Sequence, residues 1–351
     1  MRIDLPFFKT NLPTSTKSPL GWKGLAGCAD SLAIALTIQQ HNQFLVVVTP
    51  DNHTALRLEH EVAFFLQDRD AILHFPDWET LAYDVFSPLP EIISQRLKTL
   101  TRLSTVERGV LIVSVATLMQ RLAPRKHILA NSFEIRVGGL FKLAEQRTRL
   151  DSVGYQYVNQ VLQHAEFSIR GSIIDLFPMG STLPYRIELF DDEVESIRTF
   201  DPETQRSLEQ VKSISLFPAR EFPVTDDSIK QFRKNFRLQF PSAPLNNPIY
   251  NDVTQGIMPG GIDYYLPLFV DSTDTLFDYL PAGTVFCRGL EVTEQATAIY
   301  EEIELRYEQR KYDLERPLLA PETLFIETAA LDERLRSFRQ VFVGEGNRIT
   351  K

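Results

Sequence analysis

The segment Gly24–Ser31 has the spacing of a phosphate-binding loop. Such a loop reads G-x-x-x-x-G-K-[ST], and its lysine contacts the β- and γ-phosphates of a nucleotide. Gly24 and Ser31 match the first and last positions, but Ala29 replaces the second glycine and Asp30 replaces the lysine. A carboxylate there repels phosphate, and Ala29 restricts the backbone that would wrap it. We therefore expect this segment neither to bind nor to hydrolyse ATP, and a simple helix entry would lead to the same expectation.

Metal-ligating and nucleophilic residues form no recognisable set. Cys28 and Cys287 lie far apart in the sequence, which indicates neither a disulfide framework nor a metal site and suits a reducing compartment. His53 and His60 fall in one expected helix without a carboxylate or cysteine in register, so a zinc site is not favoured. We expect no catalytic residues, no metal and no cofactor.

A recognition surface is the remaining candidate, on an expected strand over residues 185–190. Side chains alternate between the faces of a strand, so Ile187 and Leu189 should share the buried face. Arg186 and Phe190 then share the solvent face, and an exposed aromatic ring beside an arginine is typical of protein interfaces. The alternative is that Phe190 packs under a neighbouring loop and Arg186 pairs with a nearby acid.

The flanking residues predict a short antiparallel sheet. One strand is expected over residues 167–177, with Arg170 near its start and Gly171 allowing a bulge or a close backbone approach. A polar turn at 191–193 leads to the next expected strand at 194–200.

Composition limits the class of protein. The chain has 351 residues, enough for two or three domains, and its 43% hydrophobic and 24% charged content is ordinary for a soluble globular protein. We see no signal peptide and no run of about 18 apolar residues, so a cytoplasmic protein without a membrane span is expected. The net charge of −9 argues against a global basic field for nucleic acid. A local basic patch stays open, and its candidate residues are Lys23, Arg121, Arg125, Lys126 and Arg136.

The order of expected elements predicts an α/β fold with an inserted unit. Strands and helices alternate in the first third of the chain, which indicates a parallel sheet covered by helices on both faces. Shorter strands then suggest a small α+β domain, and a third part of the chain completes or flanks the first. The expected domains are residues 1–124, 125–217 and 218–351. The expected elements are strands at 44–49, 71–75, 109–115, 132–137 and 284–287, and helices at 52–66, 88–103, 117–122, 140–152, 228–240 and 292–312.

Several short sequence motifs together indicate a known family. They are Asp77-Trp78-Glu79-Thr80-Leu81, Tyr83-Asp84-x-Phe86-Ser87-Pro88, Ile92-Ile93-Ser94-x-Arg96-Leu97, the stretches 109–121 and 170–201, and Pro317-Leu318-Leu319. With these phrases, nearly the whole chain resembles the N-terminal part of the bacterial transcription-repair coupling factors. That resemblance implies a module like the excision-repair protein UvrB, in which a RecA-type, helicase-like sheet domain is split by an inserted domain.

The resemblance also implies a function. In the family the inserted domain binds UvrA, and the matching positions here are Arg170, Arg186 and Phe190. UvrB carries a long hairpin that clamps damaged DNA, whereas no room for one exists between Tyr83 and the helix residues at 91–103. The resemblance therefore implies a recruitment module without catalysis or independent damage verification. The competing hypothesis is a DNA-binding helicase lobe without its own ATPase.

The resemblance further implies a longer parent protein. Such a parent would continue into a domain that binds RNA polymerase and a motor that translocates on double-stranded DNA with ATP, displacing the stalled polymerase. In the family a C-terminal domain masks the UvrA-binding face. We therefore expect this chain to be a fragment, with the end at 344–351 lacking a tidy stop.

Overall fold

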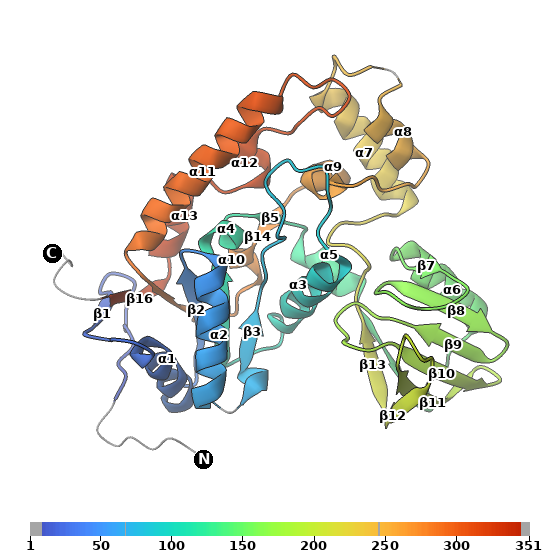
Figure 1. Ribbon diagram of the computed structural model, residues 1–351, viewed down its shortest axis with the longest axis horizontal. Coiled ribbons are helices and arrows are strands. Elements are labelled where there is room, and N and C mark those ends of the chain that lie inside the picture. The colour runs from blue at the N-terminus through green and yellow to red at the C-terminus, as the bar shows by residue number, and fades with distance from the viewer. Residues whose placement is uncertain (1–8, 67, 245, 345–351) are drawn as a thin grey trace.

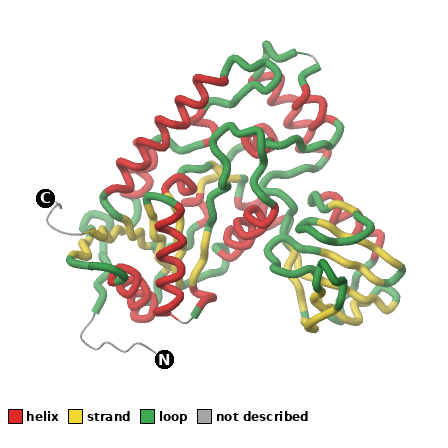
Figure 2. The backbone as a smooth tube through the Cα atoms, viewed as in Figure 1, coloured by secondary structure: helices red, strands yellow, loops and turns green. Residues whose placement is uncertain are grey.

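The computed structural model describes residues 9–66, 68–244 and 246–344, so the expected fragment end beyond 344 lies outside them. Two sheets occupy separate regions, drawn in yellow in Figure 2, and helices and loops connect them. Across the described residues, no helix is both long and apolar enough to cross a membrane. Nor does any group of three or more His, Cys, Asp or Glu side chains within those ranges have an arrangement that could hold a metal ion.

The larger sheet has six parallel strands in the order β1-β16-β15-β2-β4-β3 (Figure 1). Every residue of the two apolar strands β2 and β4 is buried, as expected for a parallel sheet with both faces covered. The strands are β1 (Leu20–Lys23), β2 (Phe44–Thr49), β3 (Ile72–His74), β4 (Gly109–Ser114), β15 (Val285–Arg288) and β16 (Arg339–Gly344).

Helices cover both faces of this sheet, which confirms the expected α/β layering. Leu45 and Val47 of β2 join the apolar cluster of α1 (Ala29–Gln40) and α2 (Asn52–Leu66). Val46 and Val48 join the opposite cluster, which contains the apolar side chains of α3 (Pro90–Arg102), α11 (Glu291–Arg310) and α13 (Thr328–Arg336). The alternation follows from the period of two along a strand.

The smaller sheet has the order β12-β11-β10-β9-β8-β7 and is antiparallel except between β7 and β8. Leu150 of α6 (Leu143–Ser152) shares an apolar cluster with Ile187 and Ile197 of this sheet. The strands are β7 (Gln156–Tyr157), β8 (Glu166–Arg170), β9 (Ile173–Leu176), β10 (Tyr185–Phe190), β11 (Glu193–Phe200) and β12 (Ser207–Val211).

Several elements differ from the sequence prediction. The single strand expected over 167–177 is the hairpin β8–β9, and Gly171 forms its turn with φ +64°. The helix expected over 117–122 is the shorter α4 (Val115–Leu118), followed by β5 (Arg121–Leu122). The sequence did not predict β1, at the sheet edge, or β16 beside it, because strands of four to six residues carry little periodic signal.

The inserted sheet is joined to the large domain by paired strands and by buried polar contacts. β6 (Phe133–Arg136), where the chain enters, pairs with β13 (Ser213–Leu216), where it leaves. The Gly180 N–H donates to Ser94 Oγ of α3 at 2.7 Å. Arg96 of α3, which is fully buried, forms an ion pair with Glu221 just after β13.

The last third of the chain adds a helical region and then returns to the large sheet as β15 and β16. Its first helices pack through aromatic rings, among them Phe232, Phe236 and Phe269. The domain boundaries at 124 and 217 stay predictions. The remaining elements are α5 (Arg125–Ala130), α7 (Asp226–Gln239), α8 (Pro248–Thr254), α9 (Leu266–Phe269), α10 (Leu276–Tyr279), α12 (Pro321–Leu324), β14 (Asp274–Thr275) and the short helices at Arg69–Ala71 and Ile262–Tyr265.

Candidate functional site

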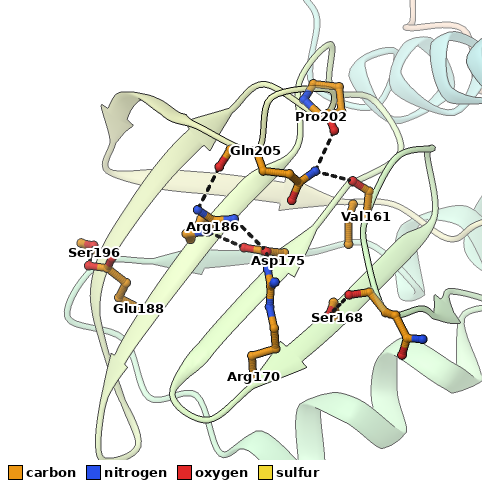
Figure 3. Close-up of polar contacts among 10 residues, drawn as sticks. Val161, Ser168, Arg170, Asp175, Arg186, Glu188, Ser196, Pro202 and Gln205 are labelled. Carbon is orange, nitrogen blue, oxygen red and sulfur yellow. Dashed lines mark hydrogen bonds and ion pairs between the residues drawn. The ribbon is translucent and has the colours of Figure 1, made fainter.

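Three strands of the small sheet bring the two expected arginines to one carboxylate. Arg186 of β10 lies opposite Asp175 of β9 in the strand register, and Asp175 lies opposite Ser168 of β8. Arg170 is two residues beyond Ser168 and therefore points to the same face. Figure 3 shows both arginines directed at Asp175.

Asp175 is the buried centre of this arrangement, with a side chain only 1% exposed. Arg186 Nε lies 2.7 Å from Asp175 Oδ1 and Nη2 lies 3.0 Å from Oδ2, while Arg170 Nη2 also donates to Oδ2. A buried carboxylate is tolerated only when paired in this way. The hydrogen bonds that Arg186 donates to Asp175 raise the pKa of Arg186. Two guanidinium groups thus face one carboxylate, and the nearby Glu188 carboxylate on β10 also raises the pKa of Arg186.

The two arginines differ in what they offer to a partner. Arg186 Nη1 donates to the Gln205 carbonyl at 3.2 Å, and its guanidinium lies 4.9 Å from the ring centroid of Phe200. Its side chain is 18% exposed, whereas that of Arg170 is 54% exposed. The alternative interpretation, that Arg186 pairs with a nearby acid, is therefore correct for this residue. Arg170 presents most of the free charge.

Phe190 stands at the open end of the same face and is 71% exposed. It is the last residue of β10, opposite Glu193, and the turn after it contains Asp191 with φ +52°. The ring does not pack under a neighbouring loop, so that alternative is wrong. The expected alternation holds, since Ile187 and Leu189 are buried.

Leu140 is a neighbour of Phe190 that sequence analysis missed. It forms a β-bridge with Glu193, so Leu140 and Phe190 lie on either side of Glu193. Leu140 is 72% exposed, yet its loop is firmly held, because Gly138 N donates to the Val194 carbonyl at 2.8 Å. The sequence predicted a helix from residue 140, whereas α6 begins at Leu143, so Leu140 lies in the loop before the helix. No local pattern reveals a contact that spans more than fifty residues.

The segment that resembles a phosphate loop connects β1 to α1. Gly24 has φ +73°, and Ala29 is the first residue of α1. The Asp30 carboxylate accepts a hydrogen bond from the Ser31 N–H at 2.7 Å and lies 3.6 Å from Arg57 Nη2. Its position in the first turn is the one where a phosphate would have to lie.

The Ser31 side chain connects this segment to α2 by a hydrogen bond. Ser31 Oγ donates to Glu61 Oε2 at 2.5 Å, and Arg57 Nη1 lies 2.9 Å from the same carboxylate oxygen. Burial would raise the pKa of Glu61, but the hydrogen bonds from Ser31 and Arg57 outweigh it and lower the pKa. Asp30 and Glu61 against Arg57 leave a net negative charge, which disfavours phosphate.

The five basic residues proposed as a DNA patch do not form one surface. Lys23 ends β1 at one edge of the large sheet, whereas Arg136 lies in β6, and Figure 1 shows β1 and the β6 partner β13 on opposite sides of the molecule. Arg136 pairs with Glu134 at 2.5 Å, and Arg121 Nε donates to the Glu322 carbonyl at 2.9 Å. That form of the DNA hypothesis is not supported.

The phrase at residues 77–97 has a structural role. The Arg96 guanidinium lies 5.3 Å from the ring centroid of Trp78 and donates to the Pro76 carbonyl at 2.7 Å. Ser94 accepts from Gly180 of the inserted unit. These residues therefore fasten the inserted sheet to the large domain.

Comparison with known proteins places these features in a family. Residues 133–222, which contain the sheet face described above, match the model of the UvrB interaction domain. The transcription-repair-coupling factor of Haemophilus influenzae is 42% identical over 336 residues, covering 95% of this chain and 29% of that protein. The chain belongs to the transcription-repair coupling factor family.

Other members of the family give the same result. The transcription-repair-coupling factor of Escherichia coli is 40% identical over 318 residues, and that of Bacillus subtilis is 29% identical over 304 residues. The resemblance to the N-terminal module of these coupling factors is thereby confirmed. The chain spans less than a third of the length of these curated relatives, 25% to 29% of each.

Proposed function

We propose that the chain is a non-catalytic recruitment module of transcription-coupled DNA repair, which binds UvrA through the outer face of the small sheet. The observation that carries the proposal is a rigid, exposed combination of charge and apolar groups inside the region that matches the UvrB interaction domain. Arg170 pairs with Asp175 but is 54% exposed, so its guanidinium can also pair with a carboxylate of UvrA. Phe190 and Leu140 supply two apolar anchors.

The proposal assigns different roles to the two arginines. Arg170 contacts UvrA directly, while Arg186, which is mostly buried, positions Asp175 and through it Arg170. Leu140 extends the docking face beyond the three residues expected from the sequence. Because the strand pairing holds Phe190, Glu193 and Leu140 in register, little conformational entropy is lost when UvrA binds.

The large sheet is, in this proposal, a helicase-like lobe of RecA type that no longer binds nucleotide. Two observations support it: the sheet is parallel, and the polar groups between α1 and α2 are already bound to one another, Ser31 to Glu61 and Asp30 to Arg57. The parent protein would contribute RNA polymerase binding and ATP-driven translocation on double-stranded DNA. This chain would then connect a stalled polymerase to UvrA.

A titration of UvrA against the purified chain tests the docking face. Phe190→Ala should weaken binding by about 30-fold, since truncating an interface anchor typically costs about 2 kcal/mol. Arg186→Ala should weaken it by a similar factor. Leu208→Ser is the matched control, because Leu208 is 53% exposed but lies on β12 at the sheet edge.

The readout separates binding from folding. Phe190 is exposed, so its truncation should leave the thermal unfolding midpoint unchanged, and a loss of affinity then reflects the interface. Undiminished UvrA binding by both Phe190→Ala and Arg186→Ala would refute the docking face. If Leu140→Ser keeps full affinity for UvrA while the other two variants lose it, Leu140 is not an anchor but the rest of the docking face stands.

A further inference from the structure

The helix α7 carries a basic stripe that UvrA recruitment does not use. Lys230, Arg233, Lys234 and Arg237 recur at i, i+3, i+4 and i+7, so they share one face of the helix. Phe232 lies on the opposite face and is fully buried among aromatic rings. The aromatic core therefore fixes the rotation of α7 and turns the basic stripe outward.

The stripe forms one wall of a groove between α7 and α8. The groove has a volume of about 440 Å³, and the side chains that line it are Lys230, Arg233, Lys234, Arg237, Leu238 and Tyr250. Arg233 Nε donates to the Tyr250 hydroxyl at 3.3 Å, and the Arg237 guanidinium lies 4.0 Å from the centroid of the Tyr250 ring. The hydrogen bond from Arg233 lowers the pKa of Tyr250, as expected beside concentrated positive charge.

The positive charges of Lys230, Arg233 and Lys234 in the groove are poorly neutralised. None of the lining residues is acidic. Lys230 pairs with Asp227 at 3.0 Å, but both side chains are exposed and such a pair is weak. Within the described residues, no carboxylate lies within ion-pair distance of Arg233 or Lys234. Cations gathered in this way on a chain of net charge −9 point to an anionic partner.

We propose that this groove binds the sugar-phosphate backbone of duplex DNA. The stripe from Lys230 to Arg237 extends about 10 Å along the helix. Each DNA strand carries a phosphate about every 3.4 Å along the axis, so the stripe faces two or three phosphates. The inference concerns a surface separate from the UvrA-docking face and goes beyond UvrA recruitment.

The lining favours duplex DNA over two other anionic partners. Arg237 covers the ring of Tyr250, so that ring is not free to stack on unpaired bases as in single-strand binding proteins. A folded acidic protein would bring apolar anchors, but the aliphatic side chain of the lining, Leu238, is 71% exposed and encloses no pocket. Recognition by charge alone remains, which is how proteins bind a DNA backbone.

Fluorescence anisotropy with a labelled duplex of about 20 base pairs at about 50 mM salt tests the proposal. The wild-type chain should bind with a slope of log K against log salt near −2, because about 0.9 counterion is released per phosphate. Arg233→Glu with Lys234→Glu should weaken binding at least about tenfold, since two phosphate contacts become repulsive. The matched control is Arg108→Glu with Lys212→Glu, which makes the same charge change at exposed residues outside the groove.

Three outcomes would overturn the proposal. One is the absence of saturable binding by the wild-type chain even at about 20 mM salt. Another is an equal loss in the groove variant and the control, which would mean a response to net charge alone. The third is competition by poly-glutamate as effective as that by DNA at equal charge, which would assign the groove to an acidic protein. An unchanged thermal unfolding midpoint in both variants reports that they are folded.

Discussion

At the scale of single residues, exposure separates the groups that touch a partner from those that hold them in place. Asp175 is buried and paired with both Arg170 and Arg186. Truncating Arg186 would therefore remove a cation and also leave Asp175 with a single pairing partner. The affinity lost in Arg186→Ala measures the integrity of the Asp175 cluster as much as a contact with UvrA, whereas Phe190→Ala measures a contact alone.

The partly buried imidazole of His127 in α5 should make the free energy of unfolding depend on pH. Its Nδ1 lies 3.1 Å from the Asn131 side-chain nitrogen, and burial lowers the pKa of its imidazole. As pH falls below about 6.5, the unfolded chain takes up a proton before the folded chain does, so the free energy of unfolding decreases. His127→Gln should make this decrease shallower, measured by urea denaturation at about pH 7.5 and about pH 5.5.

The control for this prediction is His53→Gln, because His53 is exposed on α2. This variant should keep the pH dependence of the wild-type chain. If His127→Gln and the wild-type chain lose the same free energy of unfolding between the two pH values, His127 does not contribute.

At the scale of elements, two glycines with left-handed backbones have different surroundings. Gly171 in the β8–β9 turn has φ +64°, and an added Cβ would meet nothing within 4 Å. Gly180 has φ +88°, and an added Cβ would overlap the ring of Phe217. Gly171 is therefore needed only for its backbone conformation, whereas Gly180 also leaves space for the Phe217 ring.

Alanine substitutions at these two positions should therefore differ in cost. Gly171→Ala should lower the free energy of unfolding by about 1 kcal/mol, the cost of a left-handed alanine. Gly180→Ala should cost an additional 1–3 kcal/mol or so, because the Phe217 ring must move. Urea denaturation of the pair measures the difference, and equal losses would show that the Phe217 contact relaxes freely.

At the scale of the whole molecule, the buried pair of Arg96 and Glu221 connects the large domain to the chain that leaves the inserted sheet. Arg96 is fully buried, lies 4.1 Å from the centroid of the Phe75 ring and donates to the Pro76 carbonyl. Removing one partner of such a pair leaves an uncompensated buried charge. The arrangement makes the position of the docking face depend on α3.

Arg96→Ala should therefore lower the free energy of unfolding by about 3–5 kcal/mol. The double variant Arg96→Met with Glu221→Leu should recover much of this loss, since no charge is then left unpaired. Arg136→Ala, which breaks an exposed pair with Glu134, is the control and should leave stability unchanged. A double variant no more stable than Arg96→Ala would show that the ion pair itself, and not the unpaired charge, determines the loss.

The sequence by itself determined the local elements and one face of the docking sheet. The strands β2 and β4 are continuous apolar runs, and the alternation in β10 correctly placed Phe190 outside and Ile187 inside. Such patterns are readable because they repeat every two or 3.6 residues within a single element. The departures at Ala29 and Asp30 were equally plain, because a phosphate loop has a fixed local spacing.

Only the tertiary structure decided which residues meet. Arg186 finds Asp175 through strand register, Leu140 reaches Glu193 across a long stretch of chain, and α8 turns the α7 stripe into a groove. The alternative of a local basic patch is not supported for the same reason, since Lys23 and Arg136 lie on opposite sides of the molecule. Pairing and packing between distant segments depend on the burial of the whole chain, which no local period records.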